Sequence, residues 1–195
     1  MSNQLHPNTF KFLKQLKSNN NKQWFDEHRG EYEEVRKVFV EFIQTLIDEM
    51  AKSDKTLIGQ QAKNAVFRIN RDVRFSKDKT PYKTNFSAVI SSGGKKFDGV
   101  GFYLSVEPGN KNYLGGGIWQ PEAKPLAAIR QEIDYNFKEF QKIVESKNFK
   151  NTLPQFYQDS LKTMPKGYEA SNPAAEYLRC KSFVFGTNLN DAEAN

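Results

Sequence analysis

Apolar side chains recur with a helical period in the first quarter of the chain. From Glu31 to Ala51 their spacings alternate between three and one, which is typical of a helix that buries one face. This stripe consists of Val35, Val38, Phe39, Phe42, Ile43, Leu46, Ile47 and Met50. A shorter helical pattern begins near Pro7, since proline suits the first position of a helix. We therefore predict a long N-terminal helix with a shorter helix before it.

After Ser53 the apolar positions change to a two-residue period, which is typical of strands. The runs that show it are Ala65 to Ile69, Phe86 to Ile90, Phe102 to Val106, Asn112 to Leu114 and Ser182 to Phe185. Short turns separate the central runs, and a short turn joins antiparallel neighbours. We therefore predict an antiparallel sheet of about four or five strands.

The helical period returns after Pro121, and it predicts a second helix from Leu126 to Phe137, beyond the glycine loop Gly115–Gly117. No internal repeat and no long linker divides the chain, so residues 1–195 are interpreted as a single domain. The predicted class is α+β, with the sheet packed against the long helix and the second helix. The side chains expected in the core include Phe39, Phe42, Leu46, Phe102 and Leu104.

Composition narrows the class of protein. With 195 residues, of which 37 % are hydrophobic, the chain can bury one sizeable core. The lone Cys180 excludes an internal disulfide framework and fits a reducing compartment. There is no leader pattern and no apolar run near the ~18 residues of a spanning helix, so we expect a cytoplasmic protein that does not enter the membrane.

Positive charge is concentrated in one stretch, Phe67 to Lys83, with the sequence FRINRDVRFSKDKTPYK. Six basic and two acidic residues give it a net charge of +4, most of the formal +6 of the chain. Such a balance favours an anionic partner, although ordinary solubilising charge explains it equally well. The basic residues predicted to bind an anion are Arg71, Arg74, Lys77, Lys79 and Lys83.

Three consecutive glycines, Gly115, Gly116 and Gly117, give up side-chain packing and raise the entropic cost of folding. One explanation is the close approach of a ligand, with backbone amides facing an anion; the other is a structural bulge. We predict that these glycines and the basic stretch converge on one cleft that binds phosphate or carboxylate.

Three functions remain open for this stretch. In the first, it binds a phosphorylated or carboxylated small molecule, and Asp72 or Asp78 handles protons if the protein is an enzyme. In the second, it is a module for nucleic acid or another protein, with Phe75 and Tyr82 as stacking surfaces. In the third, the charges form an ion-pair network that only fixes the connection between strands.

Other chemistry finds little support in the sequence. His6, His28 and Cys180 lack metal-ligand spacing, and two isolated histidines do not suggest a serine or cysteine triad. The phosphate-loop and dinucleotide fingerprints are incomplete around Gly94 and Gly101. We therefore expect no metal and no cofactor.

Several motifs carry a resemblance. They are RDVRFSKDKTPYK, GFYLSVEP and GGGIWQPEAKPLAAIRQEI, with WF near the start and PKGY and YLRCKSF near the end. Together they resemble a widespread family of conserved hypothetical proteins, a domain of unknown function of about this size. The resemblance implies no reaction. It implies a further helix after the last strand, so we expect the chain to be cut short at Asn195. It also implies a histidine where this chain has Asn172, which weakens any mechanism that uses an acid or base there.

Overall fold

The computed structural model describes residue 5, residues 7–96 and residues 99–194. His6 and Asn195, on which two expectations above depend, lie outside these residues. The helices are α1 (Pro7–Ser18), α2 (Lys22–Glu27), α3 (Arg29–Met50), η1 (Lys55–Leu57), α4 (Ala62–Ala65), η2 (Gly94–Lys96), α5 (Ala123–Tyr135), α6 (Phe137–Val144), α7 (Lys147–Thr152) and α8 (Ala175–Leu178). The strands are β1 (Phe86–Ile90), β2 (Gly101–Val106), β3 (Asn112–Ile118), β4 (Gln155–Phe156) and β5 (Phe183–Leu189).

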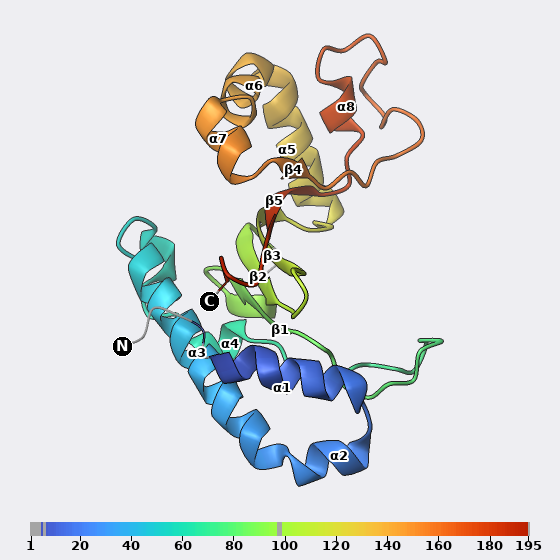
Figure 1. Cartoon of the computed structure of the whole chain (residues 1–195). Coiled ribbons are helices and arrows are strands. Elements are labelled where there is room, and N and C mark those ends of the chain that lie inside the picture. Colours follow the sequence, from blue (N-terminus) through green and yellow to red (C-terminus); the bar gives the residue numbers. More distant parts are fainter. Residues whose placement is uncertain (1–4, 6, 97–98, 195) are drawn as a thin grey trace. The chain divides into compact units, whose positions relative to one another are not determined.

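The five strands form one sheet in the order β1-β2-β3-β5-β4 (Figure 1). β1 pairs antiparallel with β2, so that Phe86 lies opposite Val106 and Ile90 opposite Phe102. β4 and β5 are also antiparallel. The predicted α+β class with an antiparallel sheet is therefore confirmed. The predicted long helix corresponds to α3 and the predicted second helix to α5, with ends that differ by one to three residues.

The first predicted strand does not form. Ala62–Ala65 is the short helix α4, and beyond it only isolated bridges occur, from Val66 to Ala88 and from Asn70 to Tyr82. Alternation of apolar and polar residues marks a half-buried extended chain, but a strand also needs a continuous partner. The stretch after α4 is therefore extended without belonging to the sheet.

The chain divides into two compact units. Unit 1 comprises residues 1–97, 102–114 and 188–195, and unit 2 comprises residues 98–101 and 115–187. β3 and β5 each pass from one unit into the other, because each strand contains one of the boundaries. That the two units together form a single domain, as the sequence suggests, stays a prediction.

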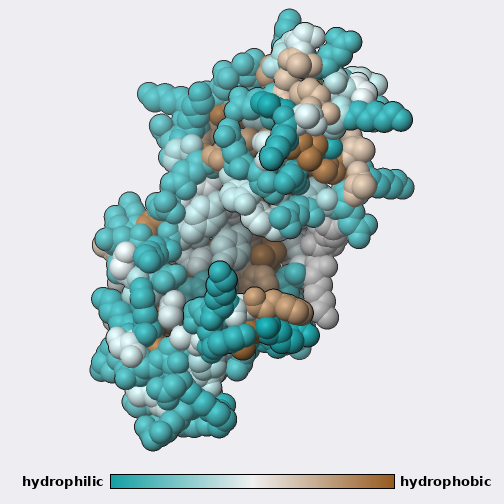
Figure 2. Space-filling model, turned by 90° about the vertical axis from the view of Figure 1, so that its right-hand side faces the viewer, coloured by the Kyte–Doolittle hydropathy of each residue, from teal (hydrophilic) through white to brown (hydrophobic). Residues whose placement is uncertain are grey.

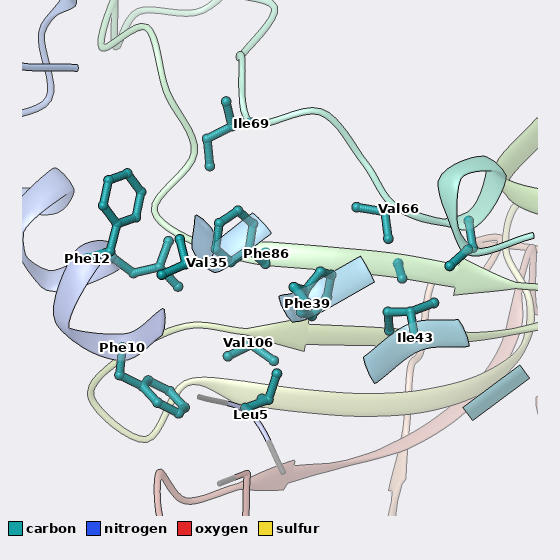
Figure 3. Close-up of a cluster of buried hydrophobic side chains, with 14 of the residues drawn as sticks. Leu5, Phe10, Phe12, Val35, Phe39, Ile43, Val66, Ile69, Phe86 and Val106 are labelled. Atoms are coloured by element: carbon teal, nitrogen blue, oxygen red, sulfur yellow. The ribbon is translucent and has the colours of Figure 1, made fainter. Parts of the chain in front are cut away.

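The core of unit 1 is built on α3. Val35, Phe39, Ile43 and Ile47 lie on one face of this helix and are all buried. Phe39 stacks on Phe86 of β1, with ring centroids 5.4 Å apart. Figure 3 shows Val35, Phe39 and Ile43 of this stripe over the strands of the sheet, together with labelled side chains from α1 and from the extended stretch after α4. The period of the sequence therefore predicts the buried face of α3 correctly.

The expected core residues differ in how deeply they are buried. Phe39 is fully buried, whereas Phe42, Leu46 and Leu104 are only partly covered. Burial of Phe102 is a wrong prediction, because 42 % of this residue is exposed. The physical reason is that Phe102 lines a cavity, which it shares with Phe42 and Leu46 of α3.

Unit 2 has its own hydrophobic cluster. Ile118 of β3 and Phe183 of β5 pack with Ile133 of α5 and Leu178 of α8. Cys180 belongs to the same cluster, and burial raises the pKa of its thiol. Such a thiol is a weak nucleophile at neutral pH, so Cys180 acts here as a small core residue.

Hydrophilic side chains cover most of the face shown in Figure 2, and hydrophobic ones gather in a few places. Among the described residues, no helix has the length and apolar character that crossing a membrane requires.

A pair of phenylalanines tests this account of the unit 1 core. Phe39→Ala removes a fully buried ring and should lower the free energy of unfolding by about 3 to 5 kcal/mol. Phe102→Ala removes a ring that is already 42 % exposed, and its effect should be clearly smaller. Urea unfolding followed by circular dichroism measures both. Equal losses would show that the stripe on α3 is not the centre of the core.

Candidate anion-binding site

The basic stretch forms a long irregular hairpin that follows α4 and includes the first residues of β1, defined here as residues 66–88. Two antiparallel bridges join its arms, Val66 to Ala88 and Asn70 to Tyr82. Backbone hydrogen bonds continue the pairing, from the Arg71 amide to the Pro81 carbonyl and from the Lys83 amide to the Ile69 carbonyl (2.9 and 2.8 Å). In Figure 1 the hairpin is the long green loop that extends away from the rest of unit 1. Its charged tip therefore projects into solvent.

The base of the hairpin is fixed to the N-terminal helices. The Asn20 side chain donates a hydrogen bond to the Tyr82 carbonyl (2.9 Å) and accepts one from the Tyr82 amide (3.1 Å). The Tyr82 ring stacks on Phe25 of α2, with centroids 4.0 Å apart. Ile69 is buried beside them in the unit 1 core. Tyr82 is thus a core residue and is not available as a stacking surface for a ligand.

Arg71 closes the hairpin from inside. Its guanidinium forms an ion pair with Asp78 and donates to the carbonyl and the hydroxyl of Thr80. Only 25 % of its side chain is exposed. Because these three acceptors all surround its Nη1 atom, Arg71 is best explained as a structural link between the two arms.

Arg74 forms a second ion pair, with Asp72. Its Nε and Nη2 atoms donate to the two carboxylate oxygens at 2.9 and 2.6 Å, the parallel geometry typical of arginine and carboxylate. The guanidinium also lies 5.9 Å from the centre of the Phe75 ring. The Arg74 side chain is 76 % exposed, and Phe75 is 96 % exposed. The tip of the hairpin therefore presents an aromatic ring to solvent next to a partly neutralised charge.

The lysines of the hairpin differ in their surroundings. Lys79 donates to the Val73 carbonyl at 2.9 Å, and Lys77 is exposed. Lys83 is partly buried, with its ammonium 5.1 Å from the centre of the Phe67 ring. Burial lowers the pKa of Lys83, and the nearby charge of Arg68 lowers it further. Among the described residues no carboxylate forms an ion pair with Lys83 or with Arg68.

Arg68 is the residue that the sequence-based site omits. Its basic charge is visible in the sequence, but it lies in an apparent strand, outside the RDVRFSKDKTPYK motif. The structure places it close enough to Lys83 to influence that residue's pKa. The sequence gives no clear signal for it, because Asp72 lies only four positions further on, and the charge of Arg68 contributes to the lowered pKa of Asp72.

The three glycines lie within strand β3, in unit 2, and do not form a loop. Gly117 has φ of +141°, and a Cβ atom there would stand only 1.9 Å from the Phe183 carbonyl oxygen. The close approach that this glycine allows is therefore the approach of the neighbouring strand β5. Convergence of Gly115–Gly117 with the basic hairpin stays a prediction.

The two aspartates have low affinity for protons. Asp72 accepts bonds from the side chain and amide of Arg74, which lower its pKa. Asp78 accepts from the Thr80 amide, from Arg71 and from the Thr80 hydroxyl, which together lower its pKa to about 2. A carboxylate with so low a pKa is a weak base near neutral pH. The geometry thus favours the ion-pair interpretation for both aspartates.

No group of three or more His, Cys, Asp and Glu side chains in the described part of the chain could hold a metal ion.

The fold and the site define a class, an α+β protein with a basic hairpin that is joined to the unit 1 core. Ion pairs within the hairpin link its arginines to its aspartates. The chain belongs to the DUF2461 family of conserved hypothetical proteins, whose family model matches residues 8–195. No curated protein and no solved structure gives a significant match to it.

The pKa of Asp78 gives a prediction with a defined sign. Because the folded protein lowers it from 3.8 to about 2, the stabilising contribution of Asp78 is fully present above pH 3.8 and is lost as the pH falls through about 2. Carbon-detected NMR titration of the carboxyl groups measures this value directly. A midpoint near 3.8 would mean that the contacts to Arg71 and Thr80 are not formed in solution.

Gly117 gives a second prediction. Gly117→Ala should strongly destabilise the protein, because the added methyl group would overlap the Phe183 backbone and φ is unfavourable for alanine. We expect a loss of melting temperature of roughly 10 °C or more, the effect of ~3 kcal/mol in a chain of this size. Gly30→Ala is the matched control, because Gly30 lies in α3 with open space at its Cβ position. There alanine should be neutral or stabilising by about 0.5 to 1 kcal/mol.

Proposed function

We propose that the protein binds a small ligand with a phosphate or carboxylate group at the base of the hairpin, mainly through Arg68 and Lys83. The observation that carries this proposal is the environment of Lys83. Its ammonium is partly buried over the Phe67 ring, beside a second cation, with no paired carboxylate among the described residues.

Such an arrangement is costly without a ligand. Burial disfavours a charged ammonium, and a like charge nearby disfavours it further. Both effects appear in the lowered pKa of Lys83. A bound anion offsets both costs, because it supplies the missing opposite charge and accepts charge-assisted hydrogen bonds. Arg68 is suited to the same ligand, because a guanidinium matches the geometry of phosphate and carboxylate oxygens.

The other charges of the hairpin serve this site indirectly. Arg71 and Arg74 hold the shape of the hairpin through their ion pairs with Asp78 and Asp72. Lys77 and Lys79 add positive potential, which attracts an anion and speeds its association. We propose binding and not catalysis, since both aspartates are engaged in ion pairs and have lowered pKa values.

A single observation favours a second candidate, a single-stranded nucleic acid. Phe75 is 96 % exposed at the tip of the hairpin, where it offers a flat apolar surface. A base stacked on such a ring contributes about 1–3 kcal/mol, and the neighbouring cations would contact the phosphates. This mode uses the tip, whereas the small-anion mode uses the base of the hairpin.

Variants of the two lysines separate a local site from general charge effects. Inorganic phosphate and pyrophosphate should raise the melting temperature of the wild-type protein, measured by thermal shift at constant ionic strength. Lys83→Met should abolish this effect, because it removes the ammonium but keeps an aliphatic side chain over Phe67. Lys77→Gln is the matched control and should retain it, since Lys77 lies at the tip. Equal responses in both variants would leave only general screening and contradict the proposal.

Salt dependence then distinguishes the two candidates. A small anion held by two cations should show a shallow dependence of affinity on salt, whereas contact with six phosphates of a single strand gives a log–log slope of about −4. A steep slope for a single-stranded oligonucleotide, together with tenfold weaker binding by Phe75→Ala, would establish the second candidate in place of the first.

A further inference from the structure

Unit 1 contains an apolar cavity of about 580 Å³ between the second half of α3 and the sheet. Its walls come from the helix, from β2 and from β3. The side chains that matter most are Phe42, Leu46, Met50, Phe102, Leu104 and Leu114. The cavity lies within unit 1 and shares no residue with the hairpin.

The cavity exists because α3 has two apolar stripes. The first, which includes Phe39 and Ile43, packs tightly on β1. The second consists of Phe42, Leu46 and Met50, which are four residues apart and only partly buried. Protein interiors are normally filled to the density of organic crystals, so unfilled space between a partly buried apolar stripe and another apolar surface is unusual. The sequence pattern predicts core here, and the structure leaves space.

The space has the size of a ligand site. Pockets for small molecules typically measure about 300–1,000 Å³ and are lined mostly by apolar side chains. At ~30 Å³ per non-hydrogen atom, the volume that one water molecule takes in the liquid, the cavity holds roughly 20 such atoms. Burying apolar ligand surface there contributes about 25 cal/mol per Å².

The charged residues that line the cavity are all acidic. Asp54 and Glu193 are its ionisable carboxylates, and no lysine or arginine lines it among the described residues. Asp54 accepts hydrogen bonds from the amide and the hydroxyl of Thr56, and these lower its pKa. Asp54 and Glu193 are both acidic residues. They disfavour an anionic head group and favour a cationic one.

The position of Glu193 is itself fixed. Its carboxylate accepts a hydrogen bond from the Asn190 amide at 2.8 Å. In the same turn, Asp191 accepts bonds from the amides of Gly109 and Asn110 (3.0 and 2.9 Å). The C-terminal turn is thus held against the turn between β2 and β3, and Glu193 is held at the cavity.

We propose that this cavity binds an apolar small molecule with an amine head group, its alkyl or aryl part between α3 and β2 and its ammonium near Asp54 and Glu193. The ligand completes the packing that the second stripe of α3 lacks. This site is independent of the proposed anion site, because it selects the opposite charge and lies on other elements.

The test uses the full chain and a neutral fluorescent probe, N-phenyl-1-naphthylamine. The probe should gain fluorescence on binding, and decylamine should displace it at concentrations at least tenfold lower than decanoate. Leu46→Trp and Met50→Trp each place an indole ring in part of the cavity and should strongly weaken probe binding. Ile143→Trp, at a 60 % exposed position in unit 2, is the matched control and should retain it.

Further readouts keep the test decisive if one variant fails to fold by circular dichroism. Glu193→Gln should reduce the advantage of decylamine over decanol without weakening decanol, because it removes one charge and keeps the acceptor for Asn190. Probe binding that neither tryptophan variant weakens overturns the proposal, as does displacement by decanoate as strong as by decylamine. A dimer in light scattering that Leu46→Trp converts to a monomer would also overturn it, since a second copy would then cover this face.

Discussion

The packing of α3 on β1 is the interaction on which unit 1 depends. Phe39 and Phe86 stack at its centre, and the buried stripe of the helix runs from Val35 to Ile47. Other parts of the unit pack against this contact. Helix α1, for example, adds Phe12, Leu13 and Leu16 to the same core. The hairpin departs from the strand that this helix covers. The rigid base of the hairpin is therefore a consequence of helix–sheet packing, and its charged tip has no role in that packing.

Much of the fold could be predicted because it follows from local periodicity. The apolar positions repeat with a helical period in α3 and α5. They repeat every second residue in β1 and β2, so the sequence predicts all four elements. The extent of burial is less predictable, because it depends on how two surfaces meet. Phe39 and Phe42 look equivalent in the sequence, yet Phe39 is fully buried and Phe42 is only partly covered. Two side chains on neighbouring stripes of one helix can therefore differ, one lying in the core and the other in the wall of a cavity.

The site could be predicted only as a region. The concentration of basic residues in the sequence identifies the hairpin, but the role of each cation depends on the groups that surround it in the folded protein. Arg71 and Arg74 have aspartates at their guanidinium groups, which no count of charges reveals. Lys83 and Arg68 have none among the described residues, and they stand out only when burial and proximity are considered together. Gly117 shows the same limit, because the backbone that requires it is more than sixty residues away in the sequence.

The contact between Asn20 and Tyr82 has a consequence for association between chains. The extended arms of the hairpin present unpaired backbone groups, and such an edge can recruit a strand from another molecule. At Tyr82 the carboxamide of Asn20 occupies both the amide and the carbonyl, the two groups that a foreign strand would use. A side chain thus takes the place of a neighbouring strand there, and the hairpin can remain extended at its base without becoming a template for aggregation.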